Sequence, residues 1–406
     1  MSELKINFFQ GQSDLLSEIK SNGDDVENKS IDAIKNKISE LFNMKNIHFL
    51  FGSGTSAGAI PTMAQLYDKV ETHINALELP RSKFVKEEFE KIKLRVEDKN
   101  LEDVLGILYS HRVYLKDGDK DNSDFKVCES LIKIIETIVF DEINIDFDDA
   151  KYKDNIENYQ RFYRKTALRN KDLSRINVFT TNNDLFNETA LDSLNIHYIN
   201  GFNGGLNRYF NPALFNYTFS KRMDTSIDKF EPVENMVHLY KIHGSINWIE
   251  DTKNANTFFK IKETFNPKKG ENNVLVYPTP TKQNKSLGSP YVEMFREFQR
   301  KLLEPLSVLF VIGYSFSDEH VNNIIYQALA TNSTMNLVII NDVSDRDIFK
   351  IEDDRIFKIW GEKTDGQKIH YFNNIINDIL PNVNAFKSES NSLNQFVKFY
   401  NENLNK

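Results

Sequence analysis

The sequence predicts an α/β protein with a mostly parallel sheet, helices on both faces of that sheet and a large helical insertion. Two observations predict the sheet. Short continuous apolar runs, such as residues 176–179 and 307–312, are typical of strands that are covered on both faces. Helical patterns separate several of these runs, as expected for βαβ units. A third observation predicts the insertion: residues 80–170 contain no strand-like run, and their apolar residues recur at helical spacing.

The predicted elements follow in a regular order along the chain. Residues 12–43 show helical spacing, the apolar run 47–51 is a strand ending in a glycine turn, and a helix begins after Pro61. Further strands are predicted at 176–179, 238–242, 274–277, 307–312 and 337–340, and helices at 291–303 and 319–329. The predicted organisation is therefore N-terminal helices (1–44), an α/β core (45–80 and 171–380), a helical insertion (81–170) and a polar C-terminal tail with a last helix (381–406).

Composition excludes several classes of protein. The 406 residues include 40% hydrophobic and 27% charged residues, enough for a substantial core. The net charge of −8 argues against a chain that coats nucleic acid, so direct nucleic-acid binding is not expected. The single cysteine, Cys128, cannot form an intrachain disulfide or a four-cysteine zinc module. No apolar run approaches the ~18–20 residues that cross a bilayer, and the start lacks a signal-peptide pattern, so we expect a cytoplasmic protein without membrane contact.

Five predicted strands end in unusual polar or glycine-rich clusters. These clusters begin at Gly52, Thr180, His243, Gly313 and Asn341. In an open parallel sheet, ligands bind beyond the carboxyl ends of the strands. If the five strands share one sheet, their clusters converge on one crevice, and we predict the binding site there.

Each cluster has a functional and a purely structural interpretation. Glycines at 52, 54 and 58 between a strand and a helix allow close approach of a phosphate, but they also suit a tight turn. Residues 180–184 can orient a sugar, an amide or a water, but they also suit an Asx turn and a helix cap. His243 is a candidate general base, although a lone histidine is commonly only a satisfied polar residue. The clusters at 313–318 and 341–342 can hold ribose hydroxyls or simply cap loops.

In combination, these motifs resemble the sirtuin family. Residues 52–56, continued by 59–61, are similar to its phosphate-binding glycine motif, and residues 181–184 to its Gln-Asn-x-Asp segment, with Thr181 replacing the glutamine. His243 and Gly244 resemble its catalytic histidine-glycine pair. Residues 313–315 and 341–342 stand where the family binds adenosine. Residues 201–212, 277–282 and 313–320 resemble the family's bacterial branch of NAD-consuming defence proteins.

The resemblance implies a Rossmann-like core and hydrolysis of NAD⁺, as substrate, to nicotinamide and ADP-ribose. Protein deacetylation is disfavoured, because the family's zinc module cannot form, its Asp-Phe-Arg segment is missing here and the stretch from Asn182 to His243 is long. The implied catalytic residues are Asn182 and His243, with no metal. The implied NAD-binding residues are Gly52, Gly54, Thr55, Ser56, Pro61, Thr181, Asp184, Gly313, Ser315, Asn341 and Asp342.

The resemblance also implies partners and alternatives. We expect a homo-oligomer, held inactive at rest, that works in anti-phage defence beside a HerA-type ATPase. The alternatives are an NAD-dependent deacylase or ADP-ribosyltransferase, and a regulatory or scaffold subunit that binds NAD or ADP-ribose without cleaving it. A nuclease is disfavoured, because we find no clustered carboxylates for catalytic magnesium.

Overall fold

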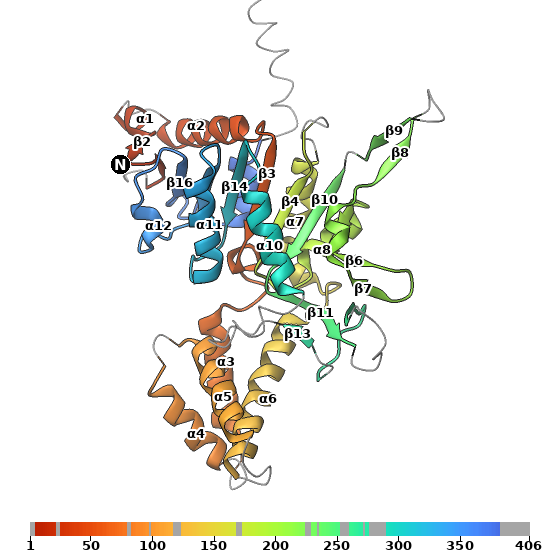
Figure 1. Cartoon of the computed structure of the whole chain (residues 1–406). Helices are drawn as coiled ribbons and strands as arrows, with labels where there is room; N and C mark the ends of the chain where they lie inside the picture. The colour runs from red at the N-terminus through yellow and green to blue at the C-terminus, as the bar shows by residue number, and fades with distance from the viewer. Residues whose placement is uncertain are drawn as a thin grey trace, which may run out of the picture.

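The main sheet of the molecule contains nine strands in the order β2-β1-β16-β15-β14-β3-β4-β10-β5 (Figure 1). This computed structural model describes residues 5–21, 25–78, 83–96, 99–116, 123–167, 173–223, 229–233, 235–251, 260–270, 273–275 and 290–381. The strands from β16 to β5 run parallel to their neighbours, and β1 and β2 form an antiparallel edge. Their bounds are β1 Asn7–Gln10, β2 Ser13–Asp14, β3 Asn46–Phe51, β4 Ile176–Thr180, β5 His197–Ile199, β10 Met236–Lys241, β14 Ser307–Ile312, β15 Asn336–Ile340 and β16 Ile356–Trp360.

Five of the parallel strands end at one level. Phe51, the last residue of β3, pairs with Ile312 of β14 on one side and with Thr180 of β4 on the other. Thr180 pairs in turn with Lys241 of β10, and Ile312 with Ile340 of β15. The five polar clusters therefore leave the sheet side by side along one edge, as the sequence predicted.

Helices cover both faces of the sheet. One face packs against α2 (Val26–Leu41), α7 (Lys153–Thr166), α8 (Phe186–Ser193), α13 (Phe372–Asn374) and the π-helical turn Ile375–Ile379. The other face packs against α10 (Tyr291–Leu302) and α11 (Glu319–Thr331). Because β3, β4, β10 and β14 are buried along their whole length, their sequences are mostly apolar rather than strictly alternating. The predicted fold class is confirmed.

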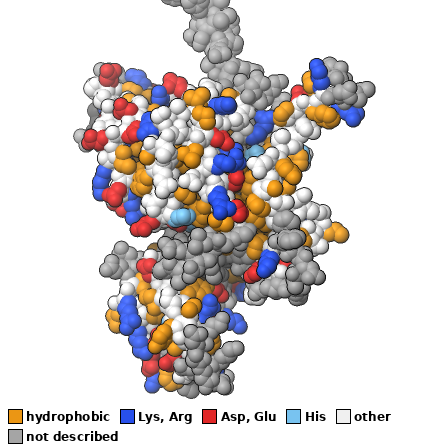
Figure 2. All heavy atoms as spheres, in the orientation of Figure 1, with side chains coloured by type: hydrophobic (Ala, Val, Ile, Leu, Met, Phe, Trp, Pro, Cys, Tyr) orange, Lys and Arg blue, Asp and Glu red, His pale blue; other side chains and the backbone are white. Residues whose placement is uncertain are grey.

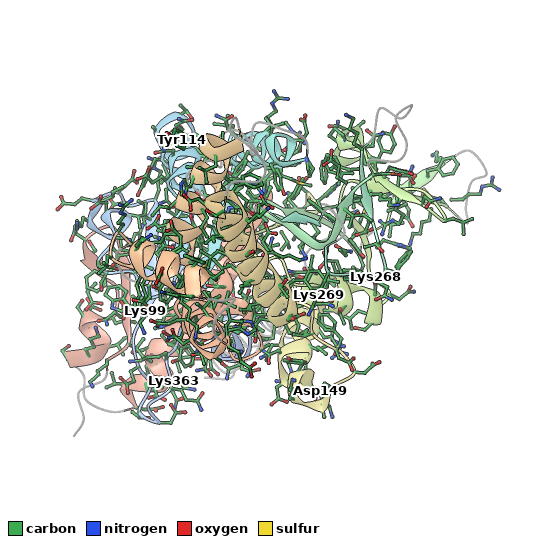
Figure 3. All side chains as sticks on the ribbon, turned by 90° about the horizontal axis from the view of Figure 1, so that it is seen from below. Lys99, Tyr114, Asp149, Lys268, Lys269 and Lys363 are labelled. Carbon is green, nitrogen blue, oxygen red and sulfur yellow. The ribbon has the colours of Figure 1, made fainter. Side chains whose placement is uncertain are left out.

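A helical module with its own core extends from the carboxyl edge of the sheet. It consists of α3 (Met63–Ala76), α4 (Lys83–Lys93), α5 (Leu101–Lys116) and α6 (Ser123–Ile143), which pack around Val70, Phe89, Leu108 and Ile132 (Figure 1). Viewed from below in Figure 3, this module lies in front of the sheet, with Tyr114 on α5 labelled. A salt bridge between Lys269 and Asp141 of α6 connects the module to the chain after β12 (Ile261–Glu263).

The packing places the boundaries of this module differently from the prediction of 81–170. Helix α3, predicted to lie in the core, belongs to the module. Helix α7, predicted to lie in the insertion, packs on the sheet through Tyr159, Phe162 and Tyr163. Spacing alone gave the helices but not their partners, because an amphipathic stripe does not indicate which apolar surface it covers.

Two further features differ from the prediction. Residues 7–10, expected within a helical N-terminal segment, form edge strand β1, and helix α1 (Ser17–Ser21) begins later than residue 12. A second, antiparallel sheet in the order β13-β11-β12-β7-β6 includes residues 274 and 275 of the strand predicted at 274–277, and residues 276 and 277 lie outside the described residues. Its strands are β6 Phe202–Asn203, β7 Arg208–Phe210, β11 Gly244–Glu250, β12 and β13 Asn273–Leu275, and a hairpin of β8 Ser220–Arg222 and β9 Phe230–Pro232 lies nearby.

The remaining elements are short. They are α12 (Asp347–Lys350) and the 3₁₀ turns Ser53–Ser56, Ala150–Tyr152 and Pro212–Asn216. Residues 277–282 and most of the predicted tail lie outside the described residues. None of the helices in the described ranges has the length and apolar character needed to span a bilayer. On the face shown in Figure 2, basic and acidic side chains lie intermixed over both the sheet domain and the module.

Buried His238 on β10 makes stability sensitive to acid. Burial lowers the pKa of its imidazole to about 4, and the charge of Lys301 adds to this effect. In the unfolded chain this histidine takes up a proton near its ordinary pKa of 6.5. The full free energy of unfolding is therefore present above that pH, and it decreases as the pH drops towards 4. The expected loss at pH 5 is about 2 kcal/mol.

The test is urea unfolding of wild type and His238→Asn at pH 7 and pH 5. The variant is expected to lose about 2 kcal/mol less than wild type between these two pH values. If both proteins lose the same free energy of unfolding between pH 7 and pH 5, protonation of His238 is not the cause of the loss of stability in acid.

Candidate functional site

The site lies where two loops, each following a strand, pack backbone against backbone. After β3 the chain enters the 3₁₀ turn Ser53–Ser56, and Gly54 N donates to Gly313 O at 2.9 Å in the loop after β14. A Cβ on Gly52 would lie 2.5 Å from Gly313 O, and a Cβ on Gly313 would lie 2.7 Å from Gly54 Cα. Gly313 also has a φ of +64°, which favours glycine. These three glycines are therefore required by the contact between the two loops.

This contact coincides with the topological switch point of the sheet. From β3 the chain continues through α7 to β4 on one side, and from β14 it continues through α11 to β15 on the other. The helices α7 and α11 cover opposite faces. Open α/β sheets bind ligands in the crevice at such a point.

Asn182 is the centre of a buried hydrogen-bond network beside this contact. Its Nδ2 lies within hydrogen-bond distance of Gly52 O (3.0 Å), Thr55 Oγ1 (3.1 Å) and Ser56 Oγ (3.2 Å). Ser56 Oγ donates to Asp184 Oδ2 at 2.7 Å. The side chains of residues 55, 56, 182 and 184 are all buried. The structure thus brings together the predicted glycine loop and the predicted 181–184 segment.

Tyr159 of α7, which is not among the residues predicted from the sequence, completes the network. Its hydroxyl donates to Thr55 Oγ1 at 2.8 Å and lies 3.0 Å from Ser56 Oγ. The ring is fully buried and stacks on Phe186 at 5.5 Å. Burial raises the pKa of this phenol, and the Asp184 charge raises it further, so Tyr159 acts as a neutral donor. The only sequence signal was an aromatic residue on the apolar stripe of a helix.

A buried charge cluster lies under the same segment. The Lys241 ammonium, 1% exposed, lies 3.1 Å from Glu188 Oε1 and also donates to the backbone oxygen of Asp184. Burial raises the pKa of both Asp184 and Glu188, and the Lys241 charge opposes this shift. Lys241 and Glu188 are not among the residues predicted from the sequence. A lysine at the end of an apolar strand was the available signal, because a buried lysine requires a partner.

His243 lies in the turn between β10 and β11. Asn183 Nδ2 donates to the backbone oxygens of His243 (2.8 Å) and Gly244 (3.1 Å), so the 181–184 segment holds this turn directly. The His243 ring points towards the loop after β14, where Nε2 lies 3.0 Å from Asp318 Oδ2. The two groups are within ion-pair distance but not in hydrogen-bond alignment. His243 and Asn182 therefore follow neighbouring strands, although their side chains contact different partners.

The other predicted residues are more exposed. Thr181 N donates to Phe51 O at 3.0 Å and so extends the pairing of β4 with β3. Asn341 Nδ2 donates to Tyr314 O at 3.1 Å, which joins the loops after β15 and β14. Ser315 Oγ donates to Ser317 Oγ, and Asp342 Oδ1 accepts from Ser344 Oγ, so both also have loop-capping contacts. Pro61 precedes Thr62, the N-cap of α3, at the junction with the helical module.

An open depression of about 1110 Å³ flanks the glycine loop. Gly54, Thr55, Ala57 and Gly58 form one wall, and residues of α7 and of the 371–377 segment form the others. Asn182 and His243 are not among its lining residues. A smaller hollow of about 370 Å³ lies at the opposite, amino end of the sheet, next to Ile176 and Val237. The depression is the one associated with the predicted site, because it shares the glycine loop.

The fold and the site define an open α/β protein with a depression beside the glycine loop at its topological switch point. Residues 176–363, from β4 to just beyond β16, match the model of the SIR2-like domain. A solved structure described as the basis for the mechanism and regulation of Sir2 enzymes is similar over 87% of this chain and 98% of its own, with 11% identity and a TM-score of 0.41. A comparison with curated proteins found no match.

Proposed function

We propose that the chain hydrolyses NAD⁺ at the bond between nicotinamide and ribose. The observation that carries this proposal is the arrangement at the switch point, where the glycine loop, Asn182 and His243 leave adjacent parallel strands at one level. The SIR2-like match over residues 176–363 and the order of the motifs support the same conclusion.

In this proposal, each cluster takes one part of the dinucleotide. Gly52, Gly54, Thr55 and Ser56 hold the pyrophosphate through backbone N–H groups and hydroxyls, because these are the donors that phosphate oxygens require. Pro61 and Thr181 border the bound dinucleotide. Gly313, Ser315, Asn341 and Asp342 hold the adenosine half. Asp184 binds the carboxamide of nicotinamide. To do so, the Asp184 carboxylate exchanges the hydrogen bond that it now accepts from Ser56 Oγ for one from the carboxamide.

The reaction itself needs few groups. The bond from ribose C1′ to the nicotinamide nitrogen breaks with its electron pair going to nicotinamide, and the sugar becomes oxocarbenium-like. A water oxygen then bonds to C1′ and loses one proton. Asn182 positions the water or the ribose hydroxyls, and His243 acts as the base towards one of them. The products are nicotinamide and ADP-ribose.

Incubation of the purified chain with NAD⁺, followed by chromatography for nicotinamide and mass spectrometry of the second product, tests the proposal. Free ADP-ribose without an added acceptor is expected. ADP-ribose attached to protein would identify a transferase, and product formation only with an acylated peptide would identify a deacylase. Saturable NAD⁺ binding without any product, with and without a partner, would indicate a regulatory subunit and contradict the proposal.

We also propose that the chain acts as a homo-oligomer in anti-phage defence and is restrained at rest, because unrestrained NAD⁺ loss kills the host cell. The helical module, which has a core separate from the sheet, is available for assembly. A HerA-type ATPase is the partner that we expect. Light scattering after gel filtration is expected to show an oligomer, and a monomer both alone and with the ATPase would contradict this part of the proposal.

A further inference from the structure

We propose that Asp318 is a positioning residue that sets the orientation and the tautomer of His243. The inference rests on the proposed function only for its effect on turnover, because the pairing itself belongs to the ligand-free protein. Asp318 lies at the start of α11, beyond β14, whereas His243 follows β10. Two strands, β3 and β4, separate β14 from β10 in the sheet, so the pair spans the crevice.

The two carboxylate oxygens of Asp318 contact different groups. Oδ1 accepts from His320 N (2.9 Å) and Val321 N (3.2 Å) and thereby caps α11. Oδ2 faces His243 Nε2 at 3.0 Å, with both side chains largely buried at 11% and 15% exposure. Capping alone needs a single acceptor oxygen, which serine also supplies. The second oxygen, directed at a histidine, is therefore not explained by the cap.

The backbone around Asp318 is itself held in place. The Tyr314 hydroxyl lies 3.2 Å from Asp318 O and 3.1 Å from Asn322 Oδ1, and Asn322 Nδ2 donates to Phe316 O at 2.9 Å. On the other side, Asn183 fixes the backbone of His243. The histidine is thus constrained at its backbone by β4 and at its ring by α11.

The nearby carboxylate favours the tautomer that carries its proton on Nε2, the ring nitrogen that faces Asp318. An ionised carboxylate only accepts, so neutral His243 presents Nε2–H to Asp318 and keeps the lone pair on Nδ1. Nδ1 is then the nitrogen available as a base. A carboxylate that orients a histidine in this way is a general device of catalysis, and its alignment commonly tightens only when the substrate is bound.

The test is Asp318→Asn, with Asp318→Ser as the matched control. In Asp318→Asn the amide oxygen is expected to stay on the two backbone N–H groups of α11, which turns its NH₂ towards Nε2. His243 must then accept at Nε2 and carry its proton on Nδ1. In Asp318→Ser the cap remains but the ring loses its partner. Both variants should retain the wild-type melting temperature within a few degrees, because asparagine and serine cap as well as aspartate.

Two measurements read out the result. Long-range ¹H–¹⁵N NMR of histidine-labelled, ligand-free protein, assigned with His243→Ala, is expected to show Nε2–H in wild type, Nδ1–H in Asp318→Asn and a mixture in Asp318→Ser. NAD⁺ cleavage by Asp318→Asn is expected to lose at least about 10²-fold in kcat with little change in KM, and Asp318→Ser less.

An unchanged tautomer in Asp318→Asn would overturn the inference, as would an unchanged kcat in a variant whose tautomer has switched. The failure of the proposed function has a different pattern: the tautomer would switch as expected, but wild type would release no nicotinamide. In that outcome the pairing stands, and only its catalytic purpose is lost.

Discussion

His243→Ala is expected to lower the turnover of NAD⁺ by about 10²–10⁴-fold, the contribution of a general base, while leaving NAD⁺ binding largely intact. Binding is expected to survive because of where His243 lies. It is in the turn after β10, where its backbone is held by Asn183 and its ring faces Asp318 rather than the glycine loop. Removal of the ring therefore takes away a proton acceptor without disturbing the contacts among Gly52, Gly54 and Gly313.

The measurement is the initial rate of nicotinamide release, with NAD⁺ binding measured separately by calorimetry. Replacement of exposed His73 on α3 by alanine is the matched control, because it removes a histidine from the helical module and leaves the sheet edge untouched. If His243→Ala cleaves NAD⁺ as fast as wild type, its assignment as base is wrong. If the variant loses binding and turnover together, His243 contributes to binding instead.

Lys241→Met is expected to destabilise the folded protein by about 3–5 kcal/mol at pH 8, because it leaves a buried carboxylate without its counter-charge. Lys241 and Glu188 are both almost inaccessible to water, at 1% and 8% side-chain exposure, and their charged groups lie 3.1 Å apart. Methionine fills a similar volume, so the loss comes from the missing charge and from the lost hydrogen bond to Asp184 O rather than from a cavity.

The pH dependence of this variant has a defined sign. Burial already raises the pKa of Glu188 above its ordinary 4.5, and loss of Lys241 removes the charge that opposes this shift. The folded variant then binds a proton that the unfolded chain releases, so its stability is greatest at low pH and falls as the pH rises through this window. Urea unfolding at pH 5 and pH 8 is expected to show a smaller deficit at pH 5.

The double variant Lys241→Met/Glu188→Gln separates this cause from general disruption. With the carboxylate neutralised, most of the lost stability is expected to return, because the two substitutions act on one pair and are not additive. A single variant as stable as wild type, or a double variant as unstable as the single one, would contradict the role of the ion pair.

The local elements of this fold follow from the sequence because their signals are local. The continuous apolar runs that become β3, β4, β14 and β15 could be predicted, and so could helices α10 and α11, from spacing alone. The same holds for the convergence of the strand-end clusters, since parallel strands in one sheet present their carboxyl ends at one edge. Edge strand β1 and strand β16 were not predicted. They pair with each other although more than 300 residues of chain separate them, and no local pattern indicates such a contact.

What the sequence alone determined is thus the chemistry available at the sheet edge: the glycines at 52, 54 and 313, the amide of Asn182 and the imidazole of His243. Only the tertiary structure decided how these groups are held. Tyr159 reaches Ser56 because α7 packs on the sheet and not in the helical module, Lys241 finds Glu188 on α8, and Asp318 meets His243 across two intervening strands. Each of these contacts joins segments distant in the chain, and hydrophobic periodicity specifies which side of a helix is buried but not which polar group it meets there.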